Sequence, residues 1–352
     1  MLRKVSGRVW VSLLTIVFLA VVLYLARHEI GKAYELLGQV NLWILLLLIP
    51  VQFVSYYAAG EMIFSFLRKK GYIKSDRAGF WTLPRLALEM NFVNHVLPSG
   101  GVSGISYMGW RLKHFGVSPS RSTAAQLVRM IAAFVGFGIL LLLSIVIMAI
   151  DGNINRWVVA AAVALVLVMA GGIALVMYLL NHRERIDGFA EWLTRSVNRI
   201  VKALTLKRKE ETLQKEQIRH FFTELRDDYK FIRQNLRVLV APCVWGLVFM
   251  TMEVALFYIS FVALGYPVNP APLVIAYGLA GVAGFFVMTP GGAGAYEAIM
   301  VTFLTVAGIN PGVALLAILL TRVLLMITTI ITGYAFYQQA VITHGKRPPT
   351  EI

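Results

Sequence analysis

The sequence contains few charged residues and almost no cysteine. Only 14% of its 352 residues are charged, whereas an average soluble domain has about 25%, and 58% are hydrophobic. The single cysteine, Cys243, lies in an apolar stretch, which excludes a disulfide framework and a thiolate metal cluster. The composition therefore predicts an integral membrane protein, in which each span needs about 20 apolar residues.

Several motifs of enzymatic chemistry are also missing. The sequence has no Gly-x-x-x-x-Gly-Lys-Ser/Thr phosphate loop, no His-Glu-x-x-His zinc pair and no Gly-x-Ser-x-Gly nucleophile turn. We expect no enzymatic activity, no cofactor and no bound metal. Transport would then be driven by a lipid gradient, by the proton gradient or by the membrane potential, which is worth about 2.3 kcal/mol per charge per 100 mV.

Basic residues outnumber acidic ones, 33 to 18, which gives a net charge of +15. Such an excess can indicate nucleic acid binding, but here the basic residues lie between apolar runs, as the positive-inside rule requires. The expected partners are anionic or phosphate-bearing membrane lipids and not nucleic acid, with a lipid-modifying enzyme as a further partner to consider. We expect a multi-pass protein of the cell (plasma or inner) membrane with both termini in the cytoplasm.

Six apolar runs are long enough to be full spans. They cover about residues 9–26, 42–67, 122–150, 157–180, 239–264 and 311–338. The first run resembles a signal peptide, but it is longer than a signal core and no small-residue cleavage site follows it. The polar segment 181–237 predicts amphipathic helices on the cytoplasmic face, or alternatively a small soluble subdomain. Residues 1–352 would form a single polytopic membrane domain.

Two further segments, 82–115 and 272–310, are poor spans because proline and glycine interrupt them. The interrupting residues are Pro98, Ser99, Gly100, Gly101 and Gly104 in the first, and Pro290, Gly291, Gly292 and Gly294 in the second. A backbone break at membrane depth survives only inside protein or beside water. We therefore predict two re-entrant helical hairpins with these residues at their tips. A loop between short spans, giving eight to ten thin crossings, is the alternative.

Residues 42–150 and 239–338 share a spacing pattern that predicts an inverted repeat. Matching features occur in the same order, namely Glu61, Pro98 and Arg129 in the first half and Glu253, Pro290 and Arg322 in the second. The acid and the proline are 37 residues apart in both halves, and the proline and the arginine are 31 and 32 residues apart. Inverted repeats are common in transporters, whose sites lie near the midplane.

Ionisable groups within spans cost about 2.5–3.5 kcal/mol each and need partners or water. The candidate substrate-binding and translocation residues are Glu61, Glu89, Asn94, His95, Arg129, Glu253, Tyr296, Glu297 and Arg322. In one interpretation Glu253–Arg322 and Glu61–Arg129 are buried pairs that lock helices. In the other, the arginines line a polar path and bind phosphate through paired N–H donors. The two interpretations are compatible.

The hairpin tips suggest a second anion-binding element. Half-helices that begin after Gly101 and Gly292 would direct unpaired N–H groups towards the midplane, although glycines also serve helix packing. Glu297, about one and a half turns into its half-helix, would balance that dipole or exchange a proton. His95 would either titrate near neutral pH or be a hydrogen-bonded structural histidine.

The two breaks, Leu97-Pro98-Ser99-Gly100-Gly101 with Gly104 and Thr289-Pro290-Gly291-Gly292-Ala293-Gly294 with Glu297, carry a family resemblance. Over about residues 9–338 the chain resembles the membrane region of the lysylphosphatidylglycerol synthetase/flippase family. Bifunctional members also have a cytosolic aminoacyl transferase domain, which this sequence lacks. The resemblance implies a stand-alone lipid-translocating or lipid-binding membrane protein.

Together, these features favour a flippase-like transporter for a phospholipid or a polyprenyl-phosphate-linked sugar, with the two tips approaching each other near the midplane. One alternative is a membrane accessory or scaffold for a glycosyltransferase or lipid-modifying enzyme, which would dock on segment 181–237. Another is a proton-coupled transporter of a soluble solute.

Overall fold

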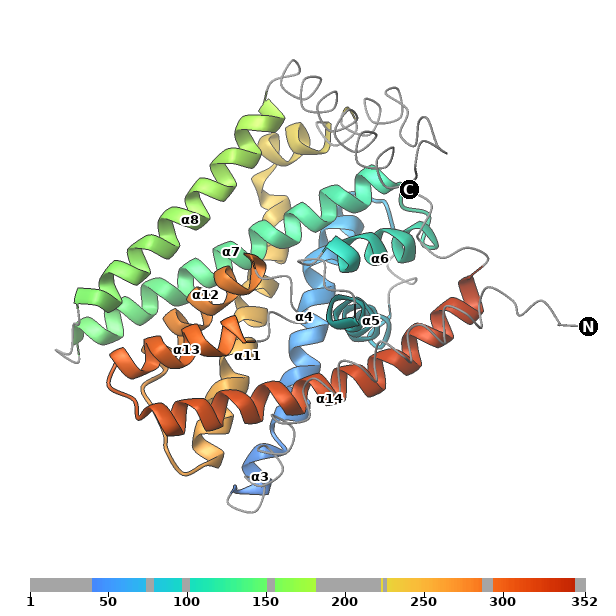
Figure 1. The fold of residues 1–352 in the computed structure, drawn as a ribbon. Coiled ribbons are helices and arrows are strands. Elements are labelled where there is room, and N and C mark those ends of the chain that lie inside the picture. The colour runs from blue at the N-terminus through green and yellow to red at the C-terminus, as the bar shows by residue number, and fades with distance from the viewer. Residues whose placement is uncertain are drawn as a thin grey trace, which may run out of the picture.

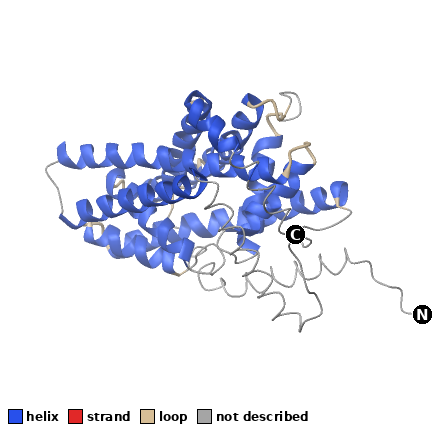
Figure 2. Cartoon of the chain, turned by 90° about the horizontal axis from the view of Figure 1, so that it is seen from above, coloured by secondary structure: helices blue, strands red, loops and turns tan. Residues whose placement is uncertain are grey.

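A computed structural model describes residues 40–73, 79–96, 102–150, 156–181, 223, 227–286 and 294–345. These described residues are helical with short connections (Figures 1 and 2) and include no strand. Several predictions lie outside the described residues: the first span at 9–26, both termini, most of segment 181–237, and the tip residues at 97–101 and 287–293.

Four long apolar helical segments form the frame of the molecule. They are α3 and α4 (Leu42–Leu45 and Leu48–Lys69), α7 (Pro119–Ile150), η3 and α11 (Leu236–Leu239 and Val240–Ala263), and α14 (Pro311–His344). Each segment is long and apolar enough to cross a membrane. The helix α8 (Arg156–Asn181) follows α7. The prediction of an all-α membrane protein is confirmed.

Helix ends follow the local sequence. Pro119 and Pro311 are the first residues of α7 and α14, a position where proline's missing N–H costs nothing. The predicted span 42–67 is two helices, because Pro50 has no N–H and its ring crowds the carbonyl of Leu46. At this point the Ile49 N–H bonds the Leu46 carbonyl at 3.1 Å, a tighter turn than in an α-helix.

The two interrupted segments each form a pair of short helices. The first pair is α5 (Thr82–Val96) and α6 (Val102–Lys113), and the second is α12 (Pro270–Phe286) and α13 (Ala295–Val306). Within each pair the two helices pack against each other. The second half-helix begins at Ala295, later than expected after Gly292. Gly294, the residue before it, has a φ of 91°, which is incompatible with a right-handed helix, so the helix starts only after this residue.

At the centre of the molecule, α11 packs against both α4 and α7 (Figure 1). Glycines allow the backbones of α7 and α11 to touch: a Cβ on Gly136 would lie 2.4 Å from the carbonyl carbon of Gly246. A Cβ on Gly246 would lie 2.2 Å from the Ala132 oxygen. Small residues at such a crossing permit the close helix approach that is typical of membrane proteins.

The short helices occupy matching places around this centre. The first pair lies between long helices, since α5 packs against α4 and α14 and α6 packs against α7. The second pair is placed likewise, with α12 against α11 and α7 and α13 against α14. Large apolar side chains such as Trp43, Leu142 and Ile150 face outwards, 83%, 61% and 79% exposed, as expected for a surface in contact with lipid. The interior between the two pairs contains polar side chains.

Candidate functional site

A salt bridge joins α13 to α14 inside the molecule. Arg322 Nη1 lies 2.7 Å from Glu297 Oε1. The other carboxylate oxygen, Oε2, accepts a hydrogen bond of 2.7 Å from the backbone N–H of Gly294. Glu297 therefore lies in the first turn of α13, not one and a half turns in, because Gly294 delays the start of the helix. In this position its negative charge stabilises the helix N-terminus.

Aromatic rings surround the arginine. The Arg322 guanidinium lies over the ring of Tyr296, 4.3 Å from its centroid, an arrangement that is worth more when water is partly excluded. Tyr296 in turn stacks on Phe257, with centroids 6.2 Å apart, and meets the ring of Tyr277 edge-on at 6.5 Å. These contacts hold the Arg322 side chain in one orientation.

A second acid–base combination lies next to these rings. Glu253 on α11 accepts hydrogen bonds from Ser55 Oγ at 2.5 Å and from the Tyr277 hydroxyl at 3.4 Å. It also interacts electrostatically with Arg129 on α7. The hydrogen bond that Arg129 makes within the described residues is a 3.5 Å contact to the weak acceptor Met90 Sδ.

The ion pairs therefore differ from those expected. Arg322 binds Glu297 in place of the predicted Glu253, because α13 packs directly on α14 and brings its first turn to the arginine. Glu61 binds Arg68 of its own helix in place of Arg129, since residues seven apart lie on one helix face. The interpretation in which Glu253–Arg322 and Glu61–Arg129 form the buried pairs therefore differs from the structure, in which Arg129 interacts electrostatically with Glu253.

We name the set of side chains that line this interior the central polar cluster. It consists of Arg129, Glu253, Tyr277, Tyr296, Glu297 and Arg322. Every member is partly exposed and none is fully buried. Charged side chains that remain partly exposed on otherwise apolar helices are typical of a polar cavity in a membrane protein.

His95 and its neighbours border the cluster from α5. The His95 ring Nδ1 lies 2.9 Å from the Asn91 carbonyl oxygen, so it is hydrogen-bonded as in the structural interpretation. It is also close enough to Arg322 for electrostatic repulsion when both are charged. One turn away, Asn91 Nδ2 donates to the Tyr56 hydroxyl at 3.2 Å, and that hydroxyl lies 2.7 Å from Thr329 Oγ1.

Three predicted site residues lie in separate, structural contacts. Glu89 is fully buried and binds Arg85 and Arg111 at 2.8 Å each and the Tyr107 hydroxyl at 2.9 Å. Glu61 is buried and forms a salt bridge with the partly exposed Arg68. Asn94 Oδ1 accepts a 2.8 Å hydrogen bond from the backbone N–H of Gly104 and so joins α5 to α6. Each of these three side chains thus has a structural partner in the first half of the chain.

Some residues of the site gave no signal in the sequence. Ser55, Tyr56, Tyr277 and Thr329 are ordinary in an apolar span, and only their convergence in space identifies them. Among the residues that the structure describes, no three His, Cys, Asp or Glu side chains gather as a metal ion would require.

Four long apolar helical segments around a partly exposed polar cluster define a polytopic membrane protein with an interior polar site. The chain belongs to the family described as the lysylphosphatidylglycerol synthase TM region, whose model matches residues 9–333, and the predicted resemblance is confirmed. A UPF0104 membrane protein of Methanothermobacter thermautotrophicus is 23% identical over 234 residues, which cover 66% of this chain and 67% of that protein. No solved structure matches. The family connects the chain to a lipid-related membrane function.

Proposed function

We propose that this protein is a flippase-like transporter that binds a phosphate-bearing lipid and moves its headgroup through the central polar cluster. The lipid would be a phospholipid or a polyprenyl-phosphate-linked sugar, transported without chemical change. The observation that carries this proposal is the partly exposed Arg322–Glu297 pair between apolar helices. The lipid tails would stay in the bilayer while polar groups replace the hydration of the headgroup, which offsets the cost of leaving water.

The chemistry of the two arginines suits a phosphate. A guanidinium presents five N–H donors in a planar fork and binds phosphate through two of them. Arg322 is held by its ring contact with Tyr296 and by one oxygen of the Glu297 carboxylate, so a bound phosphate would meet a guanidinium of fixed orientation. Arg129 contacts the Met90 thioether, and a phosphate oxygen in its place would be a much stronger hydrogen-bond acceptor.

Glu297 would be the anionic partner of Arg322 between transport events. Its carboxylate neutralises Arg322 while no headgroup is bound. An arriving phosphate would compete for the arginine, and Glu297 would remain attached to the backbone N–H of Gly294. Release of the headgroup would be completed when the carboxylate returns to Arg322. The arginine thus has two alternative anionic partners, as a transport cycle requires.

The lengths of the short helices support re-entrant hairpins. With 15, 12, 17 and 12 residues, α5, α6, α12 and α13 reach only about 18–26 Å at about 1.5 Å per residue, less than the ~30 Å hydrocarbon core. Each would enter the membrane and turn back within it. Thin crossings would instead leave backbone ends at membrane depth.

The packing of the elements also supports an inverted repeat. If α4, α5–α6 and α7 correspond to α11, α12–α13 and α14, then the contact of α5 with α14 corresponds to that of α12 with α7. Likewise α6 on α7 corresponds to α13 on α14. Arg129 and Arg322 lie 10 and 11 residues after the prolines that begin α7 and α14. The two arginines would then serve opposite sides of one site.

The test is translocation of labelled lipid in proteoliposomes, with phosphatidylglycerol and a polyprenyl phosphate as the two substrates. Glu297→Gln and Arg322→Ala should each slow movement at least tenfold for the transported lipid while the protein remains folded by circular dichroism and gel filtration. Asp227→Asn and Arg156→Ala remove matching charges at exposed positions and should not change the rate. Unimpaired translocation in both cluster variants would overturn the proposal.

A further inference from the structure

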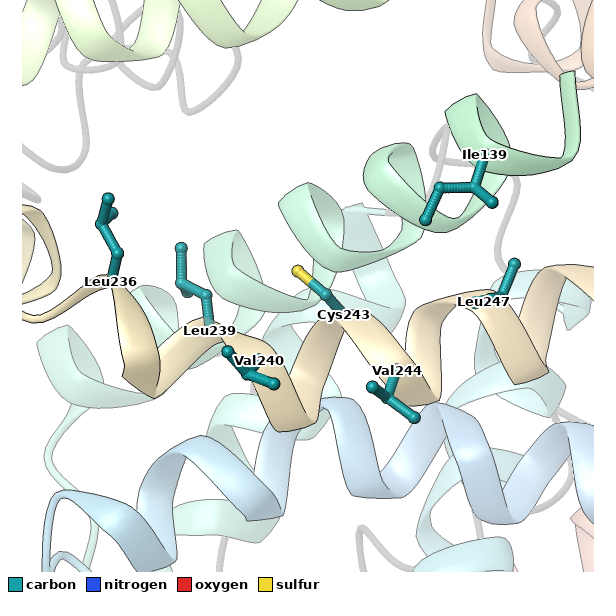
Figure 3. A pocket seen from close by; sticks show the side chains of 7 residues that line it. All are labelled: Ile139, Leu236, Leu239, Val240, Cys243, Val244 and Leu247. Carbon is teal, nitrogen blue, oxygen red and sulfur yellow. The ribbon is translucent and has the colours of Figure 1, made fainter. Parts of the chain in front are cut away.

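An apolar groove lies on the outside of the molecule where the start of α11 diverges from α7 (Figure 3). It has a volume of about 370 Å³, within the range of ligand-binding pockets. Its lining consists of Ile139 from α7, Leu236 and Leu239 from η3, and Val240, Cys243, Val244 and Leu247 from α11. The lining includes no charged side chain, and none of these residues belongs to the central polar cluster.

The dimensions of the groove match one acyl chain. Its lining residues follow one side of the helix from Leu236 to Leu247, which spans about 16 Å at about 1.5 Å per residue. Half of the ~30 Å hydrocarbon core, the depth of one leaflet, is about 15 Å. Leu236 and Val244 are 65% and 56% exposed, so the groove opens to the surroundings and is not an internal void.

One end of the groove carries positive charge. Arg237 adjoins Leu236, the first lining residue, and its side chain is exposed. Lys69 at the end of α4 is also exposed and donates a hydrogen bond of 2.8 Å from Nζ to the Arg237 carbonyl oxygen, which places a second ammonium group beside it. The buried acid in this region, Asp228, is paired with Lys70 at 3.0 Å. Among the described residues 69–70 and 227–237, five basic side chains (Lys69, Lys70, Lys230, Arg233 and Arg237) outnumber the two acids Asp227 and Asp228.

We propose that this groove is a binding site for an anionic phospholipid, separate from the central polar cluster and independent of the proposed transport. One acyl chain lies in the groove along α11, and the phosphate and anionic headgroup lie between Arg237 and Lys69. The apolar length of the groove matches an acyl chain, and its basic end matches an anionic headgroup. A zwitterionic lipid would satisfy the length, but its own cation would face the two basic side chains.

Cys243 supplies the probe, because it is the one cysteine in the sequence and it lines the groove (Figure 3). The full chain, labelled with bimane at Cys243, would be reconstituted with phosphatidylcholine or phosphatidylglycerol brominated in its acyl chains, at equal mole fractions. Bromine quenches the dye only on close approach. We expect the anionic lipid to quench with at least a fivefold higher relative association constant, since each basic side chain near anionic lipid contributes about fivefold.

The variants separate this site from ordinary lipid contact. Arg237→Gln with Lys69→Gln should bring the two lipids to equal quenching, whereas Arg156→Gln, which removes an exposed charge elsewhere, should leave the preference intact. A second measurement avoids the label: Val244→Trp fills the groove and should lower the phosphatidylglycerol retained in native mass spectra. Equal quenching by both lipids in the unmodified chain, or no quenching by either because protein covers the groove, would overturn the proposal.

Discussion

Glu297 uses its two carboxylate oxygens for two different elements. One oxygen lies 2.7 Å from Arg322 on α14, and the other accepts from the Gly294 N–H that precedes α13, also at 2.7 Å. The same side chain therefore stabilises the start of a half-helix and connects that half-helix to a long helix. Any anion that displaces it from Arg322 would change the contact between α13 and α14 without uncapping α13.

The first prediction concerns this competition and uses binding as the readout. Glu297→Gln retains an acceptor for the Gly294 N–H but removes the negative charge that competes for Arg322. Binding of a phosphate-bearing lipid in detergent should therefore tighten about tenfold, the size of one charge-assisted hydrogen bond, although translocation is lost. Arg322→Ala should lose binding. Microscale thermophoresis with a fluorescent lipid measures both, with Asp227→Asn as control, and weaker binding by Glu297→Gln would contradict the exchange.

The second prediction separates structural carboxylates from those of the cluster. Glu89 is fully buried with Arg85, Arg111 and Tyr107, so Glu89→Gln leaves two guanidinium groups without their anion. Loss of one member of a buried ion pair costs about 3–5 kcal/mol, and the melting temperature of the detergent-purified protein should fall clearly. Glu297→Gln, at a partly exposed site, should shift it much less. Equal shifts would place Glu297 among the structural groups.

The sequence predicted much of the fold because apolar length and proline–glycine breaks act locally. The span predicted at 311–338 is α14, Pro311–His344, and the interrupted segments are pairs of short helices. The ion pairs failed because they depend on how helices rotate against each other. Arg322 could not be assigned to Glu297 before the packing of α13 on α14 was known.

The residues of the candidate site were likewise predicted only in part. Glu297 and Tyr296 were recognisable as polar residues beside a break, and Arg322 as an ionisable residue within a span; the three do meet. Tyr277 was not recognisable, because a tyrosine within an apolar helix has no distinguishing spacing, and only its contacts with Glu253 and Tyr296 place it. The role of Asn94 was missed for a related reason, since its partner is a backbone N–H.

The third prediction tests the crossing of α7 and α11. Gly246→Val would place a Cβ within 2.2 Å of the Ala132 oxygen, and neither backbone can yield without separating the helices. Overpacking of this kind costs about 1–3 kcal/mol or more, so thermal stability and folded yield should fall. Gly171→Val in α8 is the matched control, because nothing lies within 4 Å of its added Cβ. Similar losses in both variants would show that the crossing is not the cause.

The fourth prediction concerns the closure of α5 on α6. The Gly104 N–H donates to Asn94 Oδ1 at 2.8 Å, and a Cβ on Gly104 would lie 2.4 Å from that same oxygen. Gly104→Ala should therefore displace the Asn94 side chain and break its hydrogen bond, and Asn94→Ala should remove the bond directly, at about 1 kcal/mol. Thermal melting of the detergent-purified variants measures both losses.

The double variant distinguishes a direct contact from two independent effects. The three atoms nearest to a Cβ on Gly104 all belong to the Asn94 amide group. Asn94→Ala removes them, so the combined loss should be smaller than the sum of the single losses. Coupling of about 0.5–3 kcal/mol is typical of residues in contact, whereas distant residues add within about 0.5 kcal/mol. Additive losses would mean that the two half-helices are held by their apolar contacts, and that Gly104 serves the fold in some other way than by admitting Asn94.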